Sequence, residues 1–195
     1  MKLVLVRHGQ TYANAEAIHQ GWSNVALSEL GKKQAEKVRE KLSERHFDVI
    51  YSSDLCRAVE TAEIIACNYP STINFTQLLR EVNVGNISGV SYDTAQKQYG
   101  EKYLKCTQEY NFDLFNGETA QEFKERAGRF LRQFEECAEN KSILVITHGG
   151  LMRAIMSYIL GIEISKIAKR ISFKNCCISE IEFDHMGWKI NSLNS

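Results

Sequence analysis

Two short polar runs directly follow strongly apolar segments, one near each end of the chain. The tripeptide Arg7-His8-Gly9 comes after the apolar residues 3–6, and His148-Gly149-Gly150 comes after segment 142–147. Consecutive apolar residues of this length indicate strands buried on both faces of a sheet. In open α/β sheets, ligands bind in the crevice beyond the carboxyl ends of the strands. If the two strands are neighbours, His8 and His148 lie side by side in that crevice.

The remaining chain alternates predicted strands with helical patterns. Such alternation predicts an α/β fold, a three-layer sandwich with a mostly parallel central sheet, one antiparallel strand and helices on both faces. Thr119 and Glu122 form a capping box that begins one long helix. Further strands are expected at 47–51, 73–75, 176–183 and 188–193, and helices at 10–17, 28–46, 54–68, 91–109 and 149–160.

Composition limits the possible partners. The 24 basic residues balance the 24 acidic ones, so no net field attracts a nucleic acid or a membrane surface. With one proline and no linker composition, we expect residues 1–195 to form a single domain. The first apolar run is too short for a signal-peptide core or a membrane span, which predicts a cytoplasmic protein. Because the net charge is zero, any site for an anion must depend on a local group of basic residues.

Cysteine spacing argues against a disulfide framework or a zinc site. The six cysteines contain no C-x-x-C pair and mostly lie within helical or strand-like patterns. Free thiols in a reducing compartment fit this spacing better. The cysteines are Cys56, Cys67, Cys106, Cys137, Cys176 and Cys177.

Six blocks of residues, in order from about residue 3 to residue 160, resemble the histidine phosphatase superfamily, and more narrowly its phosphoglycerate-mutase-like branch. A single tripeptide is weak evidence, whereas ordered blocks are not expected by chance. Within that branch, the chain looks like the short bacterial phosphatases that include the broad-specificity and α-ribazole phosphate enzymes. The blocks are Arg7-His8-Gly9-Gln10-Thr11 with Asn14, Gly21-Trp22 with Leu27-Ser28-x-x-Gly31, Ser52-Ser53-Asp54-Leu55-x-Arg57-Ala58, Leu79-x-Glu81, Gly117-Glu118, and Thr147-His148-Gly149-Gly150.

The resemblance implies a chemical role for three of these residues. His8 matches the family nucleophile, which attacks phosphorus and carries the phosphoryl group as phosphohistidine. A hydrogen bond from its other ring nitrogen to a backbone carbonyl, expected to be that of Gly9, would fix the tautomer. Glu81 matches the acid that protonates the leaving alcohol and then acts as base on water. His148, if protonated, would add positive charge beside the phosphoryl group.

The resemblance also implies a set of binding residues. Arg7 and Arg57 would supply permanently charged planar donors to the phosphoryl oxygens. No metal or other cofactor is implied, because the arginines neutralise the charge that magnesium neutralises elsewhere. The expected partner is a small-molecule phosphomonoester, and no feature predicts the oligomeric state. The remaining predicted substrate-binding residues are Asn14, Gln20, Gly21 and Gly149.

Three functions stay open at this stage. A phosphatase passes the phosphoryl group to water, a cofactor-dependent phosphoglycerate mutase passes it to a second hydroxyl, and a non-catalytic relative only binds phosphorylated ligands. Family mutases hold the substrate carboxylate with an adjacent arginine pair after the acid, and the stretch 103–110 has none. The residues around Lys97, Lys102 and Lys105 are typical of the solvent-exposed face of a helix. We therefore favour a phosphatase.

A lid-like excursion is expected at about 87–116. Its opening departs from the family pattern, because Ile87 and Ser88 stand where an aromatic residue or leucine and then an acidic residue are common. The excursion is rich in aromatic residues, which favour either a bulky, partly apolar leaving group or packing of the lid on its own core. Trp22, in the loop with Gln20, is a candidate for the substrate mouth. We assign no role to His19, His46 and His185.

Overall fold

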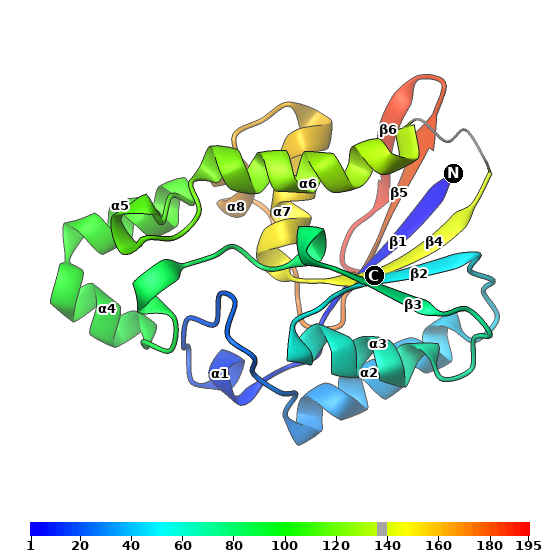
Figure 1. The fold of residues 1–195 in the computed structure, drawn as a ribbon, viewed down its shortest axis with the longest axis horizontal. Coiled ribbons are helices and arrows are strands. Elements are labelled where there is room, and N and C mark those ends of the chain that lie inside the picture. The colour runs from blue at the N-terminus through cyan, green and yellow to red at the C-terminus, as the bar shows by residue number, and fades with distance from the viewer. Residues whose placement is uncertain (136–139) are drawn as a thin grey trace.

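A computed structural model describes residues 1–135 and 140–195 and contains a six-stranded mixed sheet. The strand order is β3-β2-β4-β1-β5-β6, and β1 to β4 run parallel while β5 pairs antiparallel with both neighbours (Figure 1). This architecture confirms the predicted fold class. The strands are β1 (Lys2–Arg7), β2 (Val49–Ser53), β3 (Ile73–Thr76), β4 (Ser142–Thr147), β5 (Ile178–Asp184) and β6 (Gly187–Ser192).

The two strands that precede the histidine motifs are neighbours. β1 and β4 pair in register, with Arg7 opposite Thr147 at their carboxyl ends. The backbone N–H of His8 extends the pairing by donating to the Thr147 carbonyl over 2.8 Å. The segments that begin at His8 and His148 therefore leave the sheet at the same end of these two strands.

Helices cover both faces of the sheet, and alternate residues of β1 enter different cores (Figure 1). Leu3 and Leu5 pack in the cluster that includes the apolar sides of α6 and α7, whereas Val4 and Val6 pack with α2 and α3. This burial on both faces explains the uninterrupted apolar run. The helices are α2 (Glu29–Leu42) and α3 (Cys56–Ala66) on one face, and α6 (Ala120–Glu135) and α7 (Gly149–Leu160) on the other.

The excursion contains two helices where the sequence predicted one. The predicted helix 91–109 is wrong, because Gly100 has φ 55° and ψ −128° and separates α4 (Tyr92–Tyr99) from α5 (Glu101–Glu109). A positive φ costs glycine little, which makes it the natural residue for the break. The polar pattern of 91–109 also predicts an excursion over the surface more than a core element, which is wrong in part, since Ala95, Tyr103 and Cys106 are buried in the main core cluster.

Short helical turns complete the chain. The expected helix 10–17 is reduced to α1 (Tyr12–Ala15), which Thr11 and Asn14 cap reciprocally. The sequence did not predict α8 (Ile164–Ala168) or the three-residue turns η1 (Gln77–Leu79), η2 (Gly85–Ile87) and η3 (Asp113–Phe115). Segments this short carry too few residues for a helical periodicity to show.

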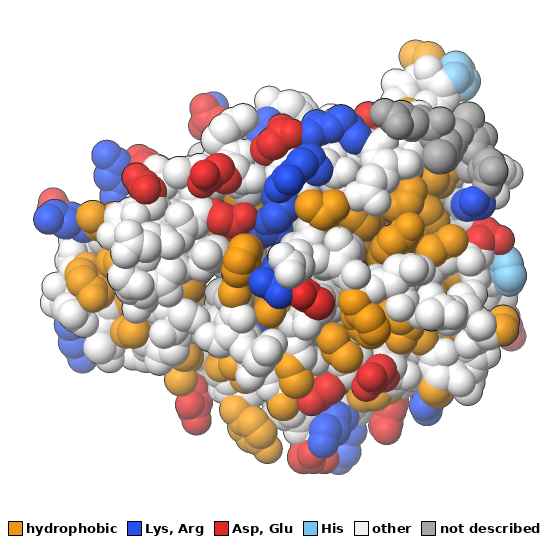
Figure 2. Space-filling model, viewed as in Figure 1, with side chains coloured by type: hydrophobic (Ala, Val, Ile, Leu, Met, Phe, Trp, Pro, Cys, Tyr) orange, Lys and Arg blue, Asp and Glu red, His pale blue; other side chains and the backbone are white. Residues whose placement is uncertain are grey.

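The described cysteines and surface agree with the composition. Cys137 lies outside the described residues, and the other five cysteines are free thiols. Acidic and basic side chains lie interspersed on the face drawn in Figure 2. Within the described part of the chain, none of the helices is long and apolar enough to cross a membrane.

Candidate active site

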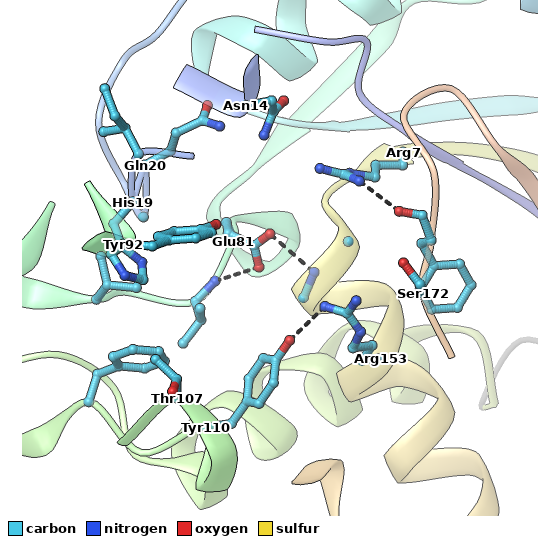
Figure 3. A pocket seen from close by; sticks show the side chains of 18 of the residues that line it. Arg7, Asn14, His19, Gln20, Glu81, Tyr92, Thr107, Tyr110, Arg153 and Ser172 are labelled. Carbon is cyan, nitrogen blue, oxygen red and sulfur yellow. Dashed lines mark hydrogen bonds between the residues drawn. The ribbon is translucent and has the colours of Figure 1, made fainter. Parts of the chain in front are cut away.

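A cavity of about 550 Å³ opens at the carboxyl edge of the sheet, between the strand ends and the excursion (Figure 3). It has the size of a small-molecule site, and residues from both halves of the chain line it. Eight of the nine residues that the sequence singled out line the cavity, and His148 lies directly behind them. The predicted residues in the lining are Arg7, His8, Asn14, Gln20, Gly21, Arg57, Glu81 and Gly149.

The two motif histidines lie side by side, with ring centroids 5.1 Å apart. His8 bonds through Nδ1 to the Gly9 carbonyl at 2.7 Å, which is the interaction the sequence analysis expected. Because a carbonyl only accepts, this bond places the proton of the neutral ring on Nδ1 and leaves Nε2 with a lone pair. Burial, together with the charges of Arg57 and Arg7, holds the pKa of His8 well below its usual range. His8 is thus a neutral imidazole whose Nε2 lone pair is free.

His148 is completely buried and also neutral. Its Nε2 bonds to Ser53 Oγ at 2.8 Å, at the carboxyl end of β2. Burial, followed by the charge of Arg57, keeps the pKa of His148 well below its usual range. In the chain without substrate, His148 is therefore a polar hydrogen-bonding group and not the cation that the sequence analysis considered.

Backbone carbonyls hold both predicted arginines, of which Arg57 is buried and Arg7 half-buried. Arg57 is fully buried and donates from Nη2 to the Gly21 carbonyl at 2.8 Å and from Nη1 to the Ser23 carbonyl at 2.9 Å. Burial lowers its pKa to about 10, so it remains charged at neutral pH. Arg7 donates from Nη1 to the Phe173 carbonyl at 2.6 Å, and burial lowers its pKa as well. Carbonyls orient these cations without neutralising them.

Three buried side-chain nitrogens in the described residues have no hydrogen-bond partner, and all three belong to this site. They are Nε of Arg7, Nε of Arg57 and Nδ1 of His148. Buried polar groups are nearly always paired, since an unpaired one costs about 1–3 kcal/mol. The two arginine N–H donors among them lie beside one cavity and indicate a site organised to receive an anion.

Glu81 reaches the same cavity from the segment after η1. Its Oε1 accepts from the Val82 amide at 2.9 Å and its Oε2 accepts from the Gly150 amide at 3.1 Å (Figure 3). A Cβ atom on Gly150 would lie 2.0 Å from Oε1, so only glycine allows the carboxyl group this close to α7. The second glycine of the histidine motif therefore serves the acid, a role the sequence analysis did not assign.

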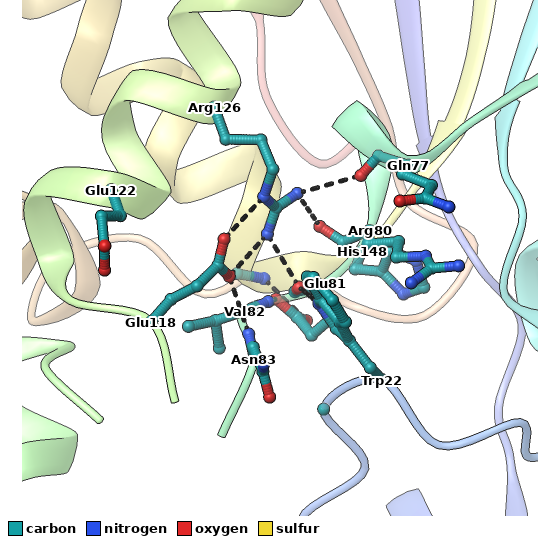
Figure 4. Close-up of polar contacts among 12 residues, drawn as sticks. Trp22, Gln77, Arg80, Glu81, Val82, Asn83, Glu118, Glu122, Arg126 and His148 are labelled. Carbon is teal, nitrogen blue, oxygen red and sulfur yellow. Dashed lines mark hydrogen bonds and ion pairs between the residues drawn. The ribbon is translucent and has the colours of Figure 1, made fainter. Parts of the chain in front are cut away.

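A buried arginine on α6 holds the backbone of the Glu81 segment (Figure 4). Arg126 donates from Nη1 to the Arg80 carbonyl at 2.7 Å and from Nη2 to the Glu81 carbonyl at 2.9 Å. Its Nε and Nη2 also donate to the two Glu118 oxygens, both at 2.8 Å, in a forked ion pair. Glu118 in turn accepts from the Asn83 amide at 2.8 Å. The position of the acid thus depends on a residue 45 positions away in the sequence.

Trp22 braces this segment from the other side and is absent from the cavity lining. Its indole N–H donates to the Glu81 carbonyl at 2.8 Å, and the Arg80 guanidinium lies 4.8 Å from its ring centre. Arg80 is itself forked onto Asp54, at 2.7 Å and 2.5 Å. Trp22 therefore acts behind the acid and not as a wall of the substrate mouth.

The other predicted binding residues have distinct positions. Asn14 Oδ1 accepts from Asn175, at 3.3 Å, and from the Thr11 amide, so its NH₂ group is left free for a ligand. Gln20 Oε1 accepts from Thr11 Oγ1 at 3.1 Å. Gly149 permits close packing, because a Cβ there would lie 3.3 Å from Arg7 Nε.

Part of the outer wall of the cavity was not predicted from the sequence. His19, which was given no role, lines the cavity, bonds through Nε2 to Tyr103 Oη at 2.8 Å, and packs on Tyr92 with ring centres 4.4 Å apart. Burial lowers the pKa of His19 to about 4. Arg153 and Tyr110 complete this wall, bonded to each other at 2.6 Å. Spacing alone held no signal for these contacts, because they join elements distant in sequence.

Comparison with known proteins assigns the family. The sequence model of the histidine phosphatase superfamily, branch 1, matches residues 3–195. The chain belongs to this superfamily. Its relatives include a phosphoglycerate mutase-like protein of Arabidopsis thaliana, 36% identical over 159 residues, which are 79% of this chain and 69% of the relative. The family assignment confirms the resemblance seen in the sequence motifs.

Phosphatases are also among the similar proteins. Phosphoserine phosphatase 1 of Hydrogenobacter thermophilus is 33% identical over 168 residues, which are 85% of this chain and 79% of that protein. A solved mutant phosphoserine phosphatase of Entamoeba histolytica, in complex with phosphoserine, superposes with a TM-score of 0.85 at 26% identity, covering 100% of this chain and 96% of that one. Mutase-like and phosphatase relatives thus share this fold.

Proposed function

We propose that this chain is a phosphomonoester hydrolase that acts on small phosphorylated metabolites through a phosphohistidine intermediate. The observation that carries the proposal is the state of His8. Its Nδ1 is engaged by the Gly9 carbonyl and its pKa is lowered by burial and by two arginines, so Nε2 is an unprotonated nucleophile within a cationic cavity. Histidine in this state attacks phosphorus without a separate base.

In the first step, the lone pair on His8 Nε2 forms a bond to phosphorus while the bond from phosphorus to the ester oxygen breaks. The electron pair of that bond goes to the leaving oxygen, which takes a proton from the Glu81 carboxyl group. The contacts of Glu81 with the Val82 and Gly150 amides hold the carboxyl group at the cavity wall for this transfer.

Arg7, Arg57 and His148 stabilise the charge on the transferring group. The buried N–H donors of this site that lack a protein partner are available to the phosphoryl oxygens. If Ser53 donates to His148 Nε2, the neutral imidazole carries its proton on Nδ1 and donates it to the phosphoryl group. Each such preorganised donor contributes about 10²–10³ in rate.

In the second step, water replaces the leaving alcohol. Glu81, now a carboxylate, takes a proton from water as the water oxygen bonds to phosphorus. The phosphorus–nitrogen bond breaks, its electron pair returns to His8 Nε2, and inorganic phosphate is released. The site is then restored to its starting protonation state.

The position of the excursion lysines favours water over a second hydroxyl as the acceptor. Lys97 pairs with Asp93 on the exposed surface, and Lys102 and Lys105 line a separate surface hollow. None of the three is among the described residues that line the active-site cavity. These three lysines therefore do not form a basic cluster that could hold phosphoglycerate in the cavity while the phosphoryl group is transferred to its second hydroxyl.

One assay separates the three candidate functions. The protein is incubated with 3-phosphoglycerate and a bisphosphoglycerate primer while both phosphoglycerate isomers and free phosphate are followed. A phosphatase releases phosphate without rapid isomer exchange, whereas rapid exchange without phosphate release overturns the proposal in favour of a mutase. Because 3-phosphoglycerate need not be the substrate, a panel of phosphomonoesters that includes p-nitrophenyl phosphate is tested in parallel, and no turnover of any member overturns catalysis.

A further inference from the structure

Arg153 places a third arginine in the active-site cavity, on α7 and one turn beyond the histidine motif (Figure 3). Its Nε donates to the Ile171 carbonyl at 3.0 Å and its Nη1 donates to Tyr110 Oη at 2.6 Å. Its Nη2 has no hydrogen-bond partner among the described residues. Two contacts thus fix the guanidinium plane and leave one N–H₂ group free.

The charges of the cavity do not balance without an additional anion. Its described lining contains three arginines, Arg7, Arg57 and Arg153, and one acidic side chain, Glu81, which the proposed first step uses in its protonated, uncharged form. His8 and His19 are neutral, since burial lowers the pKa of each. The two negative charges of a phosphoryl dianion compensate the positive charges of Arg7 and Arg57. The partners of Arg153 are a carbonyl and a hydroxyl, so its charge remains uncompensated.

The guanidinium of Arg153 is held by partners that Arg7 and Arg57 do not share, and its residue lies further along α7 than the histidine motif. Arg153 follows Gly149, which packs against Arg7, by four residues, or about 6 Å of helix rise. From the ester oxygen to an oxygen of the second anion, a spacer of two or three carbon atoms spans about 4–5 Å with bonds of about 1.5 Å. A negative group on such a spacer reaches Arg153 while the phosphoryl group lies at His8.

We propose that Arg153, positioned by Tyr110, is a second anion subsite that selects phosphomonoesters whose leaving group carries a carboxylate or a phosphate two or three carbons from the ester oxygen. This inference rests on the proposed phosphatase function and adds the class of substrate. The free Nη2 group donates to the anion, and Ser172 lies exposed at the same side of the cavity. A planar guanidinium accepts either anion.

The test uses matched substrates that differ only in the second group. 3-Phosphoglycerate is compared with glycerol 3-phosphate, and propane-1,3-diol bisphosphate with 3-hydroxypropyl phosphate, by release of inorganic phosphate. We expect kcat/KM to be at least about 10-fold higher for one or both charged members. The carboxylate pair and the bisphosphate pair distinguish the two anions. Equal kcat/KM within both pairs overturns the subsite, whereas no turnover of any ester, p-nitrophenyl phosphate included, overturns the phosphatase function instead.

Substitution then assigns the preference to Arg153. Arg153→Gln is expected to lower kcat/KM on the preferred charged substrate by about 10–100-fold, the value of a charge-assisted hydrogen bond, and on its neutral partner by less than about 3-fold. Arg153→Lys keeps the charge without the fork and restores part of the preference. Arg129→Gln, on the exposed face of α6, is the matched control and leaves both substrates unchanged.

The outcome is decided even if Arg153→Gln fails to fold. The neutral substrate reports folding within the same assay, and Tyr110→Phe removes the hydroxyl that orients Arg153 while keeping the ring. This variant is expected to raise KM selectively for the charged substrate by about 3–10-fold. Equal losses on charged and neutral substrates in the Arg153 and Tyr110 variants overturn the assignment.

Discussion

The active site has two halves of different construction. On one side, His8, His148 and Arg7 follow directly from the ends of β1 and β4, which pair in register in the middle of the sheet. On the other side, Glu81 and the aromatic wall come from segments without sheet pairing, held by side-chain contacts such as those of Arg126. In the proposed mechanism, the strand ends meet the phosphoryl group, whereas the segments of the second half meet the leaving group.

In the proposed mechanism, this difference in construction assigns the chemical step to the first half of the site and the selection of substrates to the second half. A strand end fixes its side chains through backbone pairing, which tolerates changes of sequence elsewhere, so the same phosphoryl site suits relatives with different substrates. The second half depends on individual contacts between distant elements, and each of these contacts can be changed alone. We therefore expect variants of the first half to reduce turnover of every substrate, and variants of the second half to alter the ranking of substrates.

The largest expected effect comes from His8. His8→Ala removes the nucleophile and should lower kcat by about 10⁴-fold or more on every phosphomonoester. Acid-labile labelling of the protein by a ³²P-labelled substrate should disappear with it. His46→Ala, at an exposed position outside the site, is the control. Persistence of the label in His8→Ala would refute His8 as the nucleophile.

Glu81→Gln tests the acid and should produce an effect that depends on the leaving group. For an alkyl phosphate, which needs protonation of its leaving oxygen, kcat should fall by about 10²–10⁴-fold. The leaving group of p-nitrophenyl phosphate departs without a proton. For this ester, the decrease in the rate constant of the phosphorylation step should be at least about 10-fold smaller. Single-turnover measurement of nitrophenol release isolates that step. Equal losses on both esters would show that Glu81 is not the acid.

Arg126→Lys tests whether the second half depends on contacts behind the acid. Lysine keeps the charge beside Glu118 but cannot donate to two carbonyls and a carboxylate together, so kcat on alkyl phosphates should fall by about 10-fold with KM nearly unchanged. The variant should affect p-nitrophenyl phosphate less, as Glu81→Gln does. A uniform loss on both esters, or a loss fully accounted for by a lower Tm, would reduce Arg126 to a structural residue.

The smallest expected effect concerns stability in acid. The pKa of His8, His148 and His19 is lowered by burial in the folded chain, that of His19 to about 4, whereas each lies near 6.5 when exposed. Below about pH 6.5 the unfolded chain therefore binds more protons, and the free energy of unfolding falls as pH decreases towards 4. Tm should be flat above about pH 7 and decline below it. His19→Gln should make the decline shallower, whereas His46→Gln should not.

The sequence predicted the first half of the site well, because its signals are local. An apolar run followed by Arg7-His8-Gly9 or by His148-Gly149-Gly150 marks a buried strand and its end within ten residues. The pairing of β1 with β4 could not be predicted from the sequence and was only assumed, since no local pattern decides which strands are neighbours. The ordered motif blocks then supplied Arg57 and Glu81 through the family resemblance.

The second half was predicted poorly for a physical reason. Arg153 lies in a helix whose pattern shows only that it is apolar, and its importance follows from Tyr110 and Ile171, which are distant in sequence. The break at Gly100 escaped prediction because an isolated glycine is tolerated within a helical pattern. The role of Gly150 required knowing that a carboxylate lies where its side chain would be. Such features exist only after the elements have packed.

The central place of β1 also has a consequence for how the chain is made. Its sheet partners are β4 and β5, whose residues begin at 142 and 178, so β1 is synthesised long before either strand with which it pairs. Until then the apolar segment 3–6 has no edge to join, and such long-range pairing is slow and exposes the chain to aggregation. His8 is synthesised before β4 and β5, yet its surroundings are complete only when nearly the whole sheet has formed. A nascent chain of this protein therefore carries no working site and depends on protection of its first strand.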